Sequence, residues 1–278
     1  MRRRRTLLFA YLVIAVSSLS VAAQSPSRPE ATEHYNTGIG NVAAGRWQAA
    51  ADAFRQAIKL DADDSDAHYQ LAYSLMQLDQ PNQAIEPLRN ARRLRPDDSA
   101  AADLQGTAYF ALKQFSDAVD AYEAAVELGP DNANYLNHLG VAYTHLKKYS
   151  NAAEVFRRLV QLTPTDAIAH FNLGLSELEL NRLQQAEKEF KESLRLDPTL
   201  AGAHVNIGQI HNRLNKFELA IAACKQALKI NPSSAAGHYQ LGFAYLKSGQ
   251  LKLAIDEQRT LQTLNPELAA DLAKLLPK

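Results

Sequence analysis

The chain has 278 residues and carries 30 basic and 30 acidic side chains, so its formal net charge at pH 7 is zero. This balance gives no sign of the positive surface that nucleic-acid binding requires. The single cysteine, Cys224, cannot form a disulfide within the chain.

Residues 1–23 predict a secretory signal. Four arginines precede an apolar run from Leu7 to Val16, and the small residues Val21-Ala22-Ala23 follow. This is the order of charged region, apolar region and cleavage site in such signals. The apolar run is shorter than the roughly 20 residues that span a bilayer. We expect cleavage near Ala23 and export to the periplasm. The alternative is an uncleaved anchor over the uncharged residues 6–23, with the protein facing the periplasm.

A 34-residue pattern follows a Pro/Ser-rich linker at residues 24–30 and recurs seven times without a gap. Each copy is typical of two amphipathic helices joined by a tight turn. Numbered from 1 to 34, the copies have alanine at repeat position 20 in all seven, glycine at position 8 in six and proline at position 32 in six. The copies are residues 31–64, 65–98, 99–132, 133–166, 167–200, 201–234 and 235–268.

The recurrent residues indicate how each copy packs. Small side chains at positions 8 and 20 let two helices approach closely. Glycine inside a helix costs about 0.5–1 kcal/mol relative to alanine, so its recurrence implies such a packing role. Proline at position 32 ends the second helix. We expect the large apolar residues at position 24, and the leucine or isoleucine at position 30, to point inward, with Cys224 acting as a small buried hydrophobe at position 24.

Small residues at positions 8, 20 and 27 with proline at position 32 resemble the tetratricopeptide repeat. The resemblance covers residues 31–268 and implies an all-α, right-handed superhelical array of helix-turn-helix repeats. A repeat array needs a terminal cap. Residues 269–278 complete a short amphipathic segment from Glu267 that suits this role, and we expect Leu268, Leu272, Leu275 and Leu276 to face inward.

Three features depart from the pattern. Repeat one lacks the closing proline and ends in an acidic turn that contains Asp64, and Asp here suits N-capping of the next helix. A calcium loop would need a Glu twelve positions on, which is absent. In repeat two, Pro87 should kink the second helix. Arg92, Arg93 and Arg95 follow it, and we interpret them as a solvated convex face.

Five of the eight histidines fall at repeat position 4. Equivalent positions in stacked helices lie about 10 Å apart, whereas zinc ligands must lie about 2 Å from one metal ion. These five histidines are therefore interpreted as structural. His138 and His145 share a helical face but have no third ligand nearby, so we predict no metal site. The five are His34, His68, His170, His204 and His238.

In proteins that this sequence resembles, the first helix of each repeat lines a concave groove, chiefly through positions 2, 5, 6, 9, 12 and 13. An amide occupies position 6 in five of seven copies, and an aromatic residue occupies position 5 in four. An amide can match both the C=O and the N–H of an extended peptide, and the pattern is similar to the asparagine ladder of repeat-containing glycosyltransferases. The alternative is that Asn simply suits an exposed helical turn. The candidate groove residues are Tyr35, Asn36, Tyr69, Gln70, Asn137, His138, Phe171, Asn172, Asn206, Tyr239 and Gln240.

One specificity within the family is not expected. Repeats that clamp the acidic C-terminus of cytosolic chaperones use Lys and Arg at groove positions 2, 5, 6 and 9. This chain has neither residue at those positions, and basic residues enter only at position 13, as Arg213 and Lys247.

Two classes of function remain open. The first is a non-catalytic scaffold that binds partner peptides, extended or helical, in its groove during envelope assembly or secretion. The second is a small-ligand receptor or an accessory subunit of an envelope enzyme. The sequence contains no nucleophile, metal or phosphate motif, so we predict no catalytic residue and no cofactor. The expected partners are other proteins and not nucleic acid, with membrane contact only if the N-terminal segment is uncleaved.

Overall fold

The computed structural model describes residues 29–277, and these residues form fifteen helices and no strand. The predicted signal at 1–23 and most of the linker lie outside the described residues. The helices are α1 Pro29–Ala43, α2 Trp47–Leu60, α3 Ser65–Gln77, α4 Pro81–Leu94, α5 Ser99–Ala111, α6 Phe115–Leu128, α7 Ala133–His145, α8 Tyr149–Leu162, α9 Ala167–Glu179, α10 Leu183–Leu196, α11 Ala201–Arg213, α12 Phe217–Ile230, α13 Ala235–Lys247, α14 Leu251–Leu264 and α15 Pro266–Leu275.

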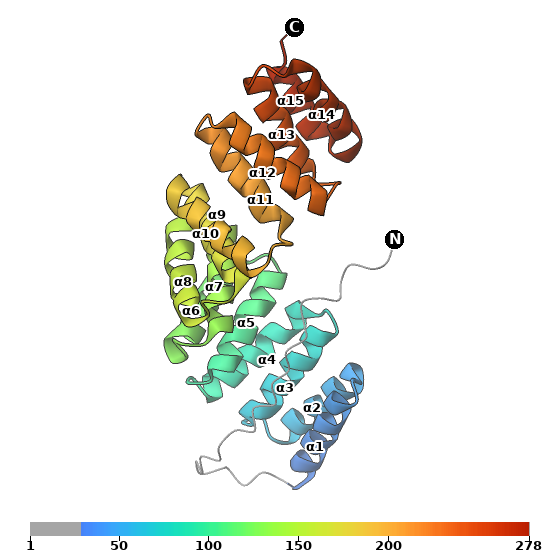
Figure 1. Ribbon diagram of the computed structural model, residues 1–278. Coiled ribbons are helices and arrows are strands. Elements are labelled where there is room, and N and C mark those ends of the chain that lie inside the picture. The colour runs from blue at the N-terminus through green and yellow to red at the C-terminus, as the bar shows by residue number, and fades with distance from the viewer. Residues whose placement is uncertain (1–28, 278) are drawn as a thin grey trace.

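The helices stack in chain order, from α1 at one end of the molecule to α15 at the other (Figure 1). Each odd-numbered helix from α1 to α13 is the first helix of a repeat and packs against the second helix that follows it. That second helix also packs against the first helix of the next repeat. The predicted all-helical repeat array is confirmed.

The 34-residue period is visible in the backbone. From α3 to α13, every first helix begins at repeat position 1, and every second helix runs from position 17 to position 30. The turn between them contains one left-handed residue, always at position 15, with φ between 56° and 82°. Glycine, Asn and Asp adopt this conformation more readily than other residues. The left-handed residues are Gly45, Asp79, Lys113, Lys147, Asn181, Asn215 and Gly249.

In four repeats, glycine at position 8 is explained by the aromatic ring at position 24 of the same repeat. A Cβ added at Gly140 would lie 2.6 Å from Cε1 of Phe156, and one added at Gly106 would lie 2.5 Å from Cδ1 of Tyr122. Repeat two has the smaller Leu88 at position 24 and tolerates alanine at position 8. The predicted packing role of this glycine is therefore confirmed, because the missing side chain leaves room for the ring on the second helix.

Helix α15 takes over this role at the end of the array. Repeat seven has no large apolar residue at position 24, and Leu272 of α15 lies over Gly242 instead, with its Cδ2 2.5 Å from a Cβ built there. Leu272 is fully buried, whereas Leu268 and Leu276 are half-buried. The expectation for Leu275 is wrong, since this residue is exposed at the last position of α15.

Two other expectations about the repeats need correction. The leucine and isoleucine residues at position 30, the last residue of each second helix, are not fully buried. Leu128, Leu162, Ile230 and Leu264 are exposed, and Leu60, Leu94 and Leu196 are half-buried. Helix α1 begins at Pro29, inside the expected linker, because proline suits the first position of a helix. Helix α4 continues through the buried Pro87 from Pro81 to Leu94, and the kink expected at Pro87 stays a prediction.

First helices are held at their N-termini by side-chain caps, as expected for Asp64. The Asp64 carboxylate accepts a hydrogen bond from the backbone N–H of Ala67 at 2.9 Å. Asp98, Asn132, Asp166 and Ser234 cap the later first helices in the same way, but Leu200 leaves α11 without a side-chain cap. None of the helices in the described part of the chain has the length and apolar character needed to cross a bilayer.

Candidate peptide-binding face

Repeat position 6 lies at the seam between successive first helices. Nδ1 of His138 on α7 lies 2.7 Å from Oδ1 of Asp103 on α5. Farther along the array, Nδ2 of Asn212 on α11 donates to the carbonyl oxygen of Gln240 at 2.9 Å and to its Oε1 at 3.0 Å. These contacts join neighbouring first helices, so position 6 faces the surface that these helices form together.

Four of the five position-6 amides have no hydrogen-bond partner for their side chains among residues 29–277. Asn36 is exposed, and Gln70, Asn172 and Asn206 are half-buried. Gln240 differs because Asn212 occupies its side-chain oxygen. The unpaired amides form two pairs, one on α1 and α3 and one on α9 and α11. Leu104 and His138 separate the two pairs. We refer to these four amides as the amide row.

The aromatic residues at position 5 pack largely within the protein. The rings of Tyr35 and Phe54 lie 5.6 Å apart, centroid to centroid, as do those of Phe171 and Phe190. Tyr69 and Tyr239 pack against buried clusters of neighbouring helices. Burial raises the pKa of the Tyr35 hydroxyl to about 12. These four side chains therefore offer only their exposed edges to a partner, and Asn137, at position 5 of repeat four, is half-buried.

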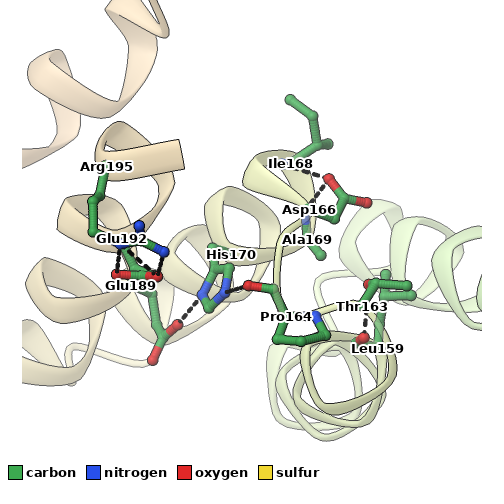
Figure 2. A network of polar contacts seen from close by, with 10 residues as sticks. All are labelled: Leu159, Thr163, Pro164, Asp166, Ile168, Ala169, His170, Glu189, Glu192 and Arg195. Atoms are coloured by element: carbon green, nitrogen blue, oxygen red, sulfur yellow. Dashed lines mark hydrogen bonds and ion pairs between the residues drawn. The ribbon is translucent and has the colours of Figure 1, made fainter. Parts of the chain in front are cut away.

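His170 and His238, two of the five histidines at position 4, hold successive repeats together. Nε2 of His170 donates to the carbonyl oxygen of Pro164 at 3.2 Å, and its Nδ1 lies 2.7 Å from Oε2 of Glu189 (Figure 2). His238 makes the same two contacts, with Pro232 and Glu257. Each histidine thus ties the end of one repeat to the second helix of its own repeat. No group of three potential metal ligands occurs among the described residues.

Two of the remaining histidines and the cysteine also have internal contacts. The ring of His145 stacks on Phe115 with centroids 4.6 Å apart. His138 instead contacts Asp103, so the two histidines have different partners. Cys224 is fully buried beneath Gly208. Burial raises the pKa of its thiol to about 12, which is the behaviour of an inert core cysteine.

Two of the arginines that follow Pro87, interpreted from the sequence as a solvated face, make hydrogen bonds to other side chains. Arg95 is hydrogen-bonded to Asp66, and its Nε donates to Oγ of Ser65 at 3.1 Å. Nη1 of Arg92 donates to Oε1 of the buried Gln105 at 2.6 Å. The Arg92–Gln105 contact joins repeats two and three, whereas the contacts of Arg95 with Ser65 and Asp66 lie within repeat two. The sequence pattern does not predict these contacts, because the two residues of each pair are far apart in the chain.

The fold and this face define a class of protein, an array of stacked helical hairpins. Models described as "Tetratricopeptide repeat" match residues 41–108, 104–167, 167–200 and 235–268, and one described as "TPR repeat" matches residues 208–249. Together they span residues 41–200 and 208–268. The chain belongs to the tetratricopeptide-repeat family.

Solved structures share this fold at low sequence identity. YrrB, described as a TPR protein with an unusual peptide-binding site, is 24% identical with a TM-score of 0.62, over 67% of this chain and 96% of its own. PilF of Pseudomonas aeruginosa is 21% identical with a TM-score of 0.62, over 76% and 96%. PilW, described as a type IV pilus biogenesis factor, is 20% identical with a TM-score of 0.63, over 75% and 98%. No curated protein sequence matches the chain.

Proposed function

We propose that this protein is a non-catalytic scaffold that binds segments of partner proteins along the surface of its first helices. The observation that carries this proposal is the amide row. Its four side chains have no partner inside the described part of the protein, and they recur at one position of the repeat. A polar group that is half-buried and unpaired is available to a ligand at little cost in desolvation.

The chemistry of the amide row favours an extended peptide. Each amide has two N–H donors and one carbonyl acceptor, so it can bond both polar groups of a backbone unit. Such contacts recognise the main chain and leave the choice of side chains to the surrounding surface. The two pairs of amides, on α1 with α3 and on α9 with α11, would hold a partner at two places. The Asp103–His138 pair lies between them.

The place of action is part of the same proposal. The predicted signal at residues 1–23 supports export to the periplasm, and a role in envelope assembly or secretion is in keeping with it. YrrB is described as having a peptide-binding site and PilW as a pilus biogenesis factor. These descriptions agree with the proposal, although at these identities the likeness itself carries only the fold.

Replacing Asn172 and Asn206 together with alanine should weaken partner capture and leave the fold intact. Both amides are unpaired, so their loss removes no internal hydrogen bond. The measurement is a crosslinking pull-down from the native envelope, quantified by mass spectrometry. The matched control replaces Gln184 and Gln226, exposed amides on the second helices of the same two repeats. Equal recovery with both double variants would refute the role of the amide row.

Export predicts a defined N-terminus. If the signal is cleaved, intact-mass measurement of the exported protein should find a chain that begins near Gln24. An intact Met1 in the membrane fraction would instead support the anchored alternative over residues 6–23.

A further inference from the structure

A furrow lined by arginines lies between repeats two and three. It has a volume of about 290 Å³ and is bounded by Arg89, Arg92 and Arg93 of α4, by Pro96 and by Gln105 of α5. The amide row lies on first helices, whereas this furrow lies mainly on a second helix. No carboxylate is among the residues that line it.

Two of the three guanidinium groups have neutral hydrogen-bond partners. Nη2 of Arg89 donates to the hydroxyl of Tyr109 at 3.2 Å, and Arg92 donates to the amide of Gln105. Nη2 of Arg93 lies 4.0 Å from Oδ1 of Asp63, and both side chains are largely exposed. A neutral partner orients a guanidinium group but leaves its charge in place. The furrow therefore concentrates the positive charge of three arginines, and the nearby carboxylates of Asp63, Glu86 and Asp117 act on them from outside its lining.

Two repeats farther on, an equivalent furrow contains a carboxylate of the protein itself. Arg157 occupies the same repeat position as Arg89, and Glu177 occupies the position of Tyr109. Oε1 of Glu177 lies 2.7 Å from Nη2 of Arg157, and its Oε2 lies 3.0 Å from Nη1 of Arg182. The Glu177 side chain is only 4% exposed. At this junction the fold buries one carboxylate between two arginines.

We propose that the furrow between α4 and α5 binds a carboxylate from an acidic segment of a partner protein. The bound carboxylate would take the part that Glu177 plays at the other junction. Arginine suits this role because its planar group can donate two parallel hydrogen bonds to a carboxylate. This surface adds a second contact to the proposed scaffold and does not depend on the amide row.

The test is the binding of fluorescein-labelled hexaglutamate to the full-length protein at low ionic strength, followed by fluorescence anisotropy. Replacing Arg89 and Arg93 with glutamine should weaken binding at least tenfold. Both side chains are exposed, so circular dichroism should show an unchanged fold. The matched control, Arg55→Gln with Arg259→Gln, changes the same charge on other second helices. Each of these arginines already pairs with an aspartate, Asp52 or Asp256. The control should bind within twofold of the unchanged protein.

A second variant tests the internal analogy. Tyr109→Glu supplies a carboxylate at the position of Glu177 and should abolish hexaglutamate binding by occupying Arg89. The Asn172→Ala/Asn206→Ala protein should bind hexaglutamate normally, which separates this inference from the amide row. The proposal is wrong if the Arg89/Arg93 variant binds within twofold of the unchanged protein, or if the control loses as much affinity. Displacement of the peptide by lower concentrations of oligothymidylate or phosphate would also overturn the assignment to an acidic peptide.

Discussion

At the scale of the residue, the pairing of positions 8 and 24 decides how closely the two helices of a repeat approach. The sequence is enough to predict that position 8 lies at a helix-packing contact, because glycine recurs there. It did not show that a ring lies directly over that glycine, since the contact depends on the rotation of both helices. Phe54, Tyr122, Phe156 and Phe190 all occupy this place.

Two glycine-to-alanine substitutions should have opposite effects on stability. Gly140→Ala should destabilise the protein by about 1–3 kcal/mol, because the new Cβ meets the Phe156 ring in a packed core. Gly40→Ala should instead stabilise it by about 0.5–1 kcal/mol. This glycine lies inside α1 with nothing within 4 Å of an added Cβ, and alanine favours the helix. Urea unfolding measures both values, and shifts of the same sign would contradict the packing account.

At the scale of the element, the sequence predicts where helices begin and end better than it predicts their contacts. Proline at position 32 and Asp or Ser at position 34 place the start of the next first helix. The pairing of His170 with Glu189 joins residues that lie 19 positions apart on two helices, so no local sequence pattern predicts it. Pro87 occupies the position of Glu189 in repeat two, and there Nδ1 of His68 is buried without a partner.

This arrangement predicts that replacing Pro87 stabilises α4. Pro87→Ala restores a backbone N–H inside the helix, where proline costs up to about 3 kcal/mol. Pro87→Glu should add a further 0.5–1.5 kcal/mol, roughly the value of one net hydrogen bond, by giving Nδ1 of His68 the partner that Glu189 gives His170. Thermal and urea unfolding of the two variants, compared with the unchanged protein, separate the effects. Equal stability of the alanine and glutamate variants would show that the pair does not form.

At the scale of the whole molecule, the array is predictable because one period governs residues 31–268. The binding face is predictable only in part. The family resemblance indicates the first helices, but the sequence does not show that the amide of Gln240 is bonded to Asn212 or that the position-5 aromatics pack internally. The arginine furrow was missed for the same reason: Arg92 and Gln105 come from different repeats. Contacts between repeats decide which polar groups remain free for a partner.

Such an array should lose stability locally when its end is damaged, because each repeat contacts only its neighbours. Leu272→Ala removes the fully buried side chain that covers Gly242 and should cost about 2–5 kcal/mol in the last repeat. Hydrogen exchange should therefore accelerate in α13 and α14 and stay unchanged in α1–α8. Leu275→Ala, in the same helix but exposed, is the control and should change stability by less than about 0.5 kcal/mol. Uniform acceleration along the whole chain would mean that the array unfolds as one cooperative unit, and the assignment of α15 as a local cap would then be wrong.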